Sequence, residues 1–483
     1  MKKLRRIISM MLIGMSLTFA SSVVASEYFE LGTPGGRGLS LEQERELGNY
    51  FITVARSQLP VITDPVLNQY LEGLVGRLAL RAQGTRFPFE PFWVRDNSIN
   101  AAAFFGGKIM VHTGVILVSE TESELSSVIA HEMYHVIQRH LARSIEEKRA
   151  NLPGGVMSIV GSLILAVINP ALGAPSLMAS MAGMQQADIN IVRANEYEAD
   201  RLAVDLLAQT GFNPRGMGNM MRHLRAAGGQ VNPAFEMLID HPAVEKRIAD
   251  ADNRAMSYKV QNYYESPEFL FAKARIMVRY SGLKAENLLQ EADKRLLTNA
   301  KEPFALYLKA LAALELKKMT EAQNALEQLK PNYGQNLFYL DTMSDFLIAE
   351  KRYAEAENML LEGRRRLGPD NEVIAANLAA LYLEMKRYND VVKVVRKCQT
   401  SRRFALGDEF LIKTYRAQRN FCGMYMVNIA SGEYAGKWDQ ALYSANEALR
   451  TCDKQDDILK VRAWMGRLAE SRSFYEHLLD NVQ

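Results

Sequence analysis

The stretch His131-Glu132-Met133-Tyr134-His135 lies in a segment whose pattern predicts an amphipathic helix. Thr121 and Glu124 upstream have the spacing of a capping box, in which two side chains satisfy the first free backbone N–H groups of a helix. Apolar residues then recur on one face, at Leu125, Val128, Ile129 and Val136. We therefore expect the quoted stretch to lie on a helix that is held in a hydrophobic core.

The two histidines of this stretch have the spacing of metal ligands. Helix residues four apart face the same side, so the imidazoles of His131 and His135 can reach one ion. Glu132 lies about 100° around the helix from His131, beside the imidazoles. Its carboxylate can take a proton from an attacking water and later deliver it to a leaving amine. The pattern predicts one zinc ion per chain, with Glu132 as the general base.

A hydrolytic zinc site takes three protein ligands, and Glu196 is the best candidate for the third. The pattern predicts a second helix over residues 188–209, and Glu196 lies on its apolar face. An acid is costly to bury there unless it binds a cation. Asp200, one turn later, can hydrogen-bond the free nitrogen of a zinc-bound histidine.

Two other polar residues near these helices are expected at the surface. On a continuous helix, His140 is turned about 140° away from His135. Glu198 points away from the face that carries Glu196. Neither residue is therefore expected to contact the metal site.

The combined pattern resembles a known peptidase family. His131 to His135, followed by Glu196-x-x-Ala199-Asp200, is similar to the gluzincin family that holds the CAAX prenyl protease and the heat-shock peptidase HtpX. Residues 97–114 resemble the strand and turn before the zinc helix of that family, and His241-Pro242 with Arg247 resembles a downstream element. The resemblance implies a gluzincin-type zinc peptidase domain.

His241 has three alternative roles, which the sequence leaves open. It could donate a hydrogen bond to the developing oxyanion, which is the usual role in gluzincins of a histidine that does not bind the metal. It could be a fourth zinc ligand that displaces water and inhibits the enzyme. It could also hydrogen-bond a loop, since the residue before a proline lies in a turn or an extended stretch.

The C-terminal half contains a repeat. Residues 316–322 recur as 350–356 and 385–391, at offsets of 34 and 35, and more loosely around 436–441. A period of 34 built from helix pairs is typical of the tetratricopeptide repeat (TPR), in which each pair buries its apolar face against its neighbours. The repeat is irregular around residues 419–436. We expect a mainly α protein with a small β-sheet, followed by an all-α TPR solenoid.

Residues 1–25 are predicted to be a signal peptide. A basic start and an apolar core from Ile7 to Phe19 precede Val23-Val24-Ala25, which fits cleavage before Ser26. That core is shorter than a bilayer span, which needs about 20 residues. The leader carries four of the 58 basic residues and none of the 55 acidic ones, so the remainder has a net charge of −1. That charge gives no indication of nucleic-acid binding. We expect a peptidase domain over 26–262 and a repeat domain over 263–483.

Two segments of the first domain are candidates for contact with substrate. Strands are predicted over 87–94 and 108–112, and the second could pair with an extended peptide. Residues 153–186 are apolar and then rich in methionine. They are expected to form a buried hairpin, a mobile lid over the cleft, or a peripheral contact with a membrane or with unfolded strands.

The resemblance, together with the predicted leader and repeats, implies a periplasmic enzyme. Such an enzyme degrades misfolded outer-membrane proteins or assists their assembly, and its repeats dock on the barrel assembly machinery. The alternative is a TPR chaperone or adaptor whose zinc site is gated or silent. Three cysteines in an oxidising compartment allow one disulfide, with a pairing that the sequence leaves open; the candidates are Cys398, Cys422 and Cys452.

Overall fold

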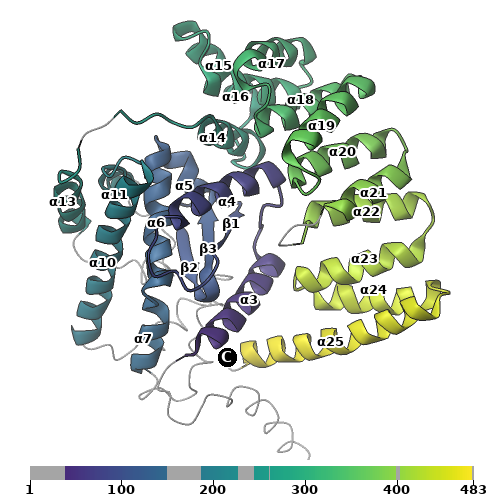
Figure 1. The fold of residues 1–483 in the computed structure, drawn as a ribbon, viewed down its shortest axis with the longest axis horizontal. Coiled ribbons are helices and arrows are strands. Elements are labelled where there is room, and N and C mark those ends of the chain that lie inside the picture. The colour runs from purple at the N-terminus through teal and green to yellow at the C-terminus, as the bar shows by residue number, and fades with distance from the viewer. Residues whose placement is uncertain (1–38, 149–185, 227–243, 260–261, 399–402, 481–483) are drawn as a thin grey trace, which may run out of the picture.

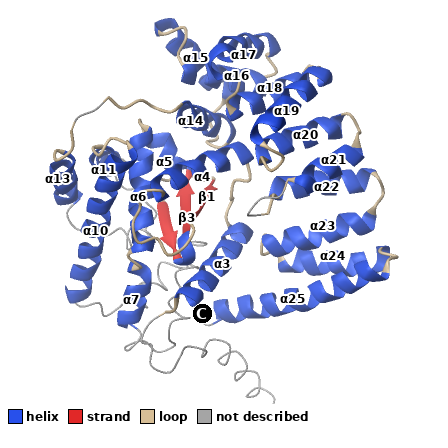
Figure 2. Cartoon of the chain, in the orientation of Figure 1, coloured by secondary structure: helices blue, strands red, loops and turns tan. Residues whose placement is uncertain are grey.

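The computed structural model describes residues 39–148, 186–226, 244–259, 262–398 and 403–480 (Figure 1). The predicted signal peptide, His241 and nearly all of the apolar segment 153–186 lie outside these residues. No helix in the described ranges combines the length and the apolar character that a bilayer crossing requires. The described chain is mainly helical with a small sheet, as the sequence predicts (Figure 2).

The described strands form a three-stranded sheet in the order β1-β3-β2. β3 lies in the centre, parallel to β1 and antiparallel to β2. The prediction that a substrate could pair with 108–112 is therefore wrong, because both edges of that strand are already bonded. The strands are β1 (Glu90–Val94), β2 (Ala101–Phe104) and β3 (Lys108–His112), with a 3-10 turn η1 (Phe105–Gly107) between the last two.

Helices surround this sheet in the N-terminal part, residues 39–259. The central one, α6, packs against α10, α11 and β2. It begins with the predicted capping box, since Thr121 accepts from the backbone N–H of Glu124 at 3.2 Å. The helices are α3 (Leu41–Gln58), α4 (Pro65–Ala79), α5 (Thr113–Val118), α6 (Glu122–Ile137), α7 (His140–Lys148), α10 (Gln186–Thr210), α11 (Gly216–Ala226) and α13 (Val244–Ala255).

The C-terminal part consists of helices that follow one another in an arc beside the N-terminal part (Figure 1). Neighbouring helices pack against each other along the whole array. They are α14 (Pro267–Arg279), α15 (Ala285–Thr298), α16 (Pro303–Glu315), α17 (Met319–Tyr333), α18 (Leu337–Ala349), α19 (Tyr353–Leu367), α20 (Glu372–Glu384), α21 (Tyr388–Lys397), α22 (Ala405–Ala417), α23 (Phe421–Tyr434), α24 (Trp438–Thr451) and α25 (Gln455–Asp480).

Five tight turns between described helices share one backbone geometry. The residue after the helix cap has a φ between 57° and 65°, and the following residue donates its N–H to a carbonyl five positions earlier. This arrangement satisfies carbonyls that the end of a helix leaves free. The first four turns follow one another at nearly the period of the sequence repeat, which confirms the repeat of helix pairs. The residues with positive φ are Lys317, Lys351, Lys386, Arg419 and Gly436.

The last step, from Arg419 to Gly436, is only half as long as the steps before it. Helix α23 therefore has this tight turn at both of its ends, and the array shifts by half a repeat there. The shift explains why the sequence repeat is irregular over the same residues.

A buried polar cluster joins the repeats to the N-terminal part. Arg275 of α14 is 2% exposed and donates to Asp64 at 2.7 Å and to Asp341 of α18 at 2.6 Å. Asp64 also caps α4, and Asp341 accepts from Asn377 of α20 at 2.9 Å. Burial alone would raise the pKa of Asp64, but Arg275 beside it holds that pKa below its usual value. One guanidinium therefore connects three helices and a helix cap.

A second contact lies at the other end of the array, where α3 meets the turn between α23 and α24. The guanidinium of Arg56 stacks 3.8 Å from the ring centroid of Tyr434. A Cβ atom on Gly436 would lie 2.7 Å from the backbone oxygen of Thr53. The other four turns carry Lys or Arg at this position, whereas here the backbone of α3 leaves room only for glycine.

A disulfide joins Cys422, at the start of α23, to Cys452, directly after α24. This is one of the pairings that the sequence allows. Cys398 is a buried thiol, and burial raises its pKa to about 12, so it carries little reactive thiolate. The covalent bond joins α23, where the array shifts by half a repeat, to the end of α24.

Replacing Arg275 with leucine should destabilise the protein strongly, because it removes the cation that lies nearest to two buried carboxylates. Breaking one partner of such a network costs about 3–5 kcal/mol. Urea unfolding followed by circular dichroism measures the loss. The control is Arg450→Leu, since Arg450 is a solvent-exposed partner of Glu447. Equal unfolding midpoints for the two variants would show that the buried cluster does not stabilise the structure.

Gly436→Lys gives this turn the residue found in three of the other four, and it should separate α3 from α23. The added Cβ meets Thr53, so hydrogen exchange should accelerate in α3 while the repeats stay folded. Gly282→Lys is the control, because Gly282 also has a positive φ but no other residue would contact a Cβ added there. If both variants exchange alike in α3, backbone strain rather than the contact is responsible.

Candidate metal centre

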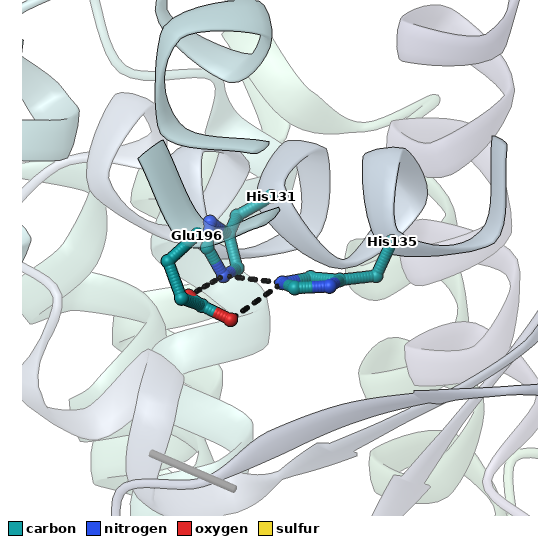
Figure 3. A group of neighbouring side chains, drawn as sticks. All are labelled: His131, His135 and Glu196. Atoms are coloured by element: carbon teal, nitrogen blue, oxygen red, sulfur yellow. Dashed lines mark hydrogen bonds and ion pairs between the residues drawn. The ribbon is translucent and has the colours of Figure 1, made fainter. Parts of the chain in front are cut away.

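Three candidate ligands meet between α6 and α10 (Figure 3). The Nε2 atoms of His131 and His135 lie 2.9 Å apart, and the Glu196 carboxylate oxygens lie 3.2 Å from the first and 3.3 Å from the second. Tetrahedral ligands at about 2.1 Å from a zinc ion are about 3.4 Å from one another. The spacing and the two-nitrogen, one-carboxylate donor set therefore fit a zinc ion with one position left for water or substrate.

The first histidine is fixed by a charged pair behind it. The Nδ1 atom of His131 lies 2.9 Å from a carboxylate oxygen of Asp200, as the sequence predicts. Arg247 of α13 donates two hydrogen bonds, of 2.6 and 2.8 Å, to the carboxylate of Asp200. Its guanidinium also lies 3.3 Å from Glu196. Burial alone would raise the pKa of Asp200, but Arg247 and His131 hold it low. The sequence marked Arg247 only by family resemblance and did not reveal this contact.

The two imidazoles have opposite electrostatic environments. Burial alone would lower the pKa of His131, but Asp200 and Glu196 raise it to about 10. Burial lowers the pKa of His135 to about 3. These pKa values favour a protonated His131 and a neutral His135 near neutral pH, and a metal bound at Nε2 of His131 would displace a proton.

His140 is buried, and the prediction that it lies at the surface is wrong. It is 4% exposed, and its Nδ1 atom lies 2.8 Å from Nδ1 of His135. The prediction assumed one continuous helix, but α6 ends at Ile137 and Arg139 adopts a φ of 54°. Arg139 is held there by Glu44 of α3 at 2.7 Å. The break in the helix turns His140 back toward the metal centre.

Glu198 is only partly the surface residue that the sequence predicts. Its side chain is 42% exposed, but one carboxylate oxygen lies 3.4 Å from Nε2 of His140 and 3.7 Å from Arg143. Two carboxylates of α10, Glu196 and Glu198, therefore both face histidines of the segment 131–140.

Glu132 lies next to the ligands and reaches the sheet. Burial raises the pKa of Glu132 to about 7, and the neighbouring His131 opposes that rise. The backbone of Ala103, in β2, lies close to the Glu132 carboxylate and also acts to lower its pKa. A carboxylate in such a place can both accept and return a proton near neutral pH.

The edge of the sheet faces this carboxylate. His112 donates its N–H to Asn100, directly opposite, so the hydrogen-bonded pairs between β3 and β2 alternate from there. In an antiparallel ladder this leaves Ala101 and Ala103 with backbone groups directed outward. Among the described strands, β2 rather than the predicted β3 has an unpaired edge beside Glu132.

A second group of possible ligands lies near the start of α6. It consists of Glu120, Glu124 and, from α11, His223. Glu124 is already occupied there, because its carboxylate accepts the backbone N–H groups of Glu120 and Thr121 as part of the capping box. Helix capping therefore accounts for the position of this carboxylate.

Comparisons with known proteins agree with this geometry. Residues 65–255 match the family described as Peptidase family M48. A putative beta-barrel assembly-enhancing protease of Vibrio cholerae is 37% identical over 76% of this chain and 76% of its own length. A beta-barrel assembly-enhancing protease of Yersinia pestis is 35% identical over the same shares, and that of Escherichia coli K12 is 32% identical over 86% and 85%. This chain therefore belongs to peptidase family M48 and is a metalloendopeptidase.

Proposed function

We propose that this chain is a periplasmic zinc endopeptidase that acts on misfolded or stalled outer-membrane proteins and assists their assembly. The observation that carries the proposal is the meeting of His131, His135 and Glu196 beside Glu132 and an open sheet edge. The substrate class and the compartment rest on the printed names of the relatives and on the predicted leader. The predicted domains, 26–262 and 263–483, are part of the proposal.

Several residues of the chain have separate roles in the proposed peptide hydrolysis. When bound, zinc supplies a Lewis acid that polarises the scissile carbonyl and makes water a better nucleophile. Glu132 takes the proton of that water and returns it to the leaving amine. Asp200 and Arg247 hold His131 in one orientation and tautomer.

The sheet edge orients the substrate. An extended peptide that pairs with β2 would bond to the outward groups of Ala101, next to Ala103, whose backbone faces Glu132. The backbone of Ala103 lies close to Glu132, and α6 packs against β2, so that edge is next to the proposed general base. Pairing through the backbone depends little on the side chains of the substrate. An enzyme that binds in this way can therefore cleave many different unfolded segments.

The repeats serve as the docking part of this proposal. Their helices are attached to the peptidase through Arg275 and meet it again at α3. The arc therefore holds any bound client or assembly factor in a defined position relative to the metal centre. His241 and the segment 153–186 keep the alternatives that the sequence allows.

Glu132→Gln should abolish cleavage and keep the metal. Removing a general base lowers the rate of hydrolysis about 10²–10⁴-fold, while the ligands stay in place. Cleavage of an unfolded substrate and metal content by mass spectrometry measure the two effects, with the exposed Glu46→Gln as control. Zinc at one per chain with unchanged cleavage would exclude Glu132 as the base. If the purified wild type contained no zinc, the zinc site would be refuted. If the wild type bound zinc but did not cleave the substrate, the chaperone alternative would be favoured.

Asp200→Asn should weaken zinc binding about 10–100-fold, because the partner that orients His131 loses its charge. The dissociation constant is measured by competition with a chelator. Asp205→Asn is the matched control, since Asp205 lies on the same helix and bonds to Arg254 in the same way, away from the ligands. Equal zinc affinity of the two variants would show that Asp200 does not orient the ligand.

A further inference from the structure

The second histidine ligand, His135, meets another imidazole at its outer nitrogen. Its Nδ1 atom lies 2.8 Å from Nδ1 of His140, and Nε2 of His140 lies 3.4 Å from Glu198. Histidine ligands of metals usually donate their outer N–H to a carboxylate, a carbonyl or a water. Here His140 takes that place, while His131 has the carboxylate of Asp200.

The direction of each hydrogen bond follows from the metal. If zinc takes Nε2 of His135, the proton of that ring lies on Nδ1 and is donated to His140. Nδ1 of His140 must then accept, so the proton of His140 lies on Nε2, where the carboxylate of Glu198 accepts it. The three side chains permit a single consistent set of donors and acceptors.

We propose that His140 and Glu198 form a positioning pair for His135, which fixes the tautomer and orientation of this ligand. The proposal rests on the proposed zinc site and adds two residues to it. His140 touches neither metal nor substrate and acts only through His135. Its place depends on the break at Arg139, so the end of α6 is part of the metal centre.

Burial supports this role over a surface one. His140 is 4% exposed, and the carboxylate that receives its outer proton is half-exposed. A buried imidazole without partners would be costly. The contacts with His135 and Glu198 satisfy both of its ring nitrogens.

The test compares His140→Phe with His140→Asn. Phenylalanine fills the space but accepts no hydrogen bond, so the zinc dissociation constant should rise about 10–100-fold. Asparagine can place its amide oxygen near the former Nδ1 atom, so its dissociation constant should stay within a few-fold of wild type. The visible absorption bands of the cobalt(II)-loaded protein should shift for the phenylalanine variant and not for the asparagine variant.

Glu198→Leu provides a second arm at the half-exposed end of the pair. It should weaken zinc binding, whereas Glu198→Gln should not, because the amide oxygen still accepts from His140. Thermal melting of the metal-free variants monitors the fold. If wild type binds zinc and both His140→Phe and Glu198→Leu bind it equally tightly, the positioning pair is refuted while the zinc site stands. If wild type binds no zinc, the proposed function fails, and the positioning pair fails with it.

Discussion

Glu196 and Asp200 lie one turn apart on α10, in the interface that this helix forms with α6. Two buried carboxylates in such an interface would be strongly unfavourable without compensating charge. His131 from α6 and Arg247 from α13 supply that charge at distances between 2.6 and 3.3 Å. The same groups that form and orient the candidate metal centre therefore hold α6, α10 and α13 together, although these helices are distant in the sequence.

This arrangement makes stability and metal binding depend on one another. A zinc ion at the meeting point of His131, His135 and Glu196 would balance the carboxylate better than the histidine proton that it displaces. Arg247 donates two hydrogen bonds to Asp200, which keep this carboxylate charged and directed at His131. The candidate ligands are thus already oriented, which would reduce the ordering that metal binding requires.

The repeat array is attached to the N-terminal part by a similar interaction, a buried arginine between two carboxylates. Arg275 connects Asp64 of the N-terminal part with Asp341 of the repeats, in a buried cluster with little freedom to rearrange. At the far end the contact is a close backbone approach at Gly436. The half-repeat shift at α23 precedes that contact directly, so the irregular part of the array is also the part that returns to the peptidase.

Local patterns in the sequence determined the two helices that carry the candidate ligands, the capping box of α6 and the repeat period. The spacing of His131 and His135 and the acid on the apolar face of α10 depend only on helical geometry, which is a property of neighbouring residues. The tertiary structure decided what lies between the elements. It buried His140 through a break at Arg139, chose β2 as the open edge, and brought Arg247 and Arg275 to carboxylates far away in the chain. Those outcomes arise because buried charges and backbone groups must find partners wherever the fold offers them, and no local period encodes which distant partner that is.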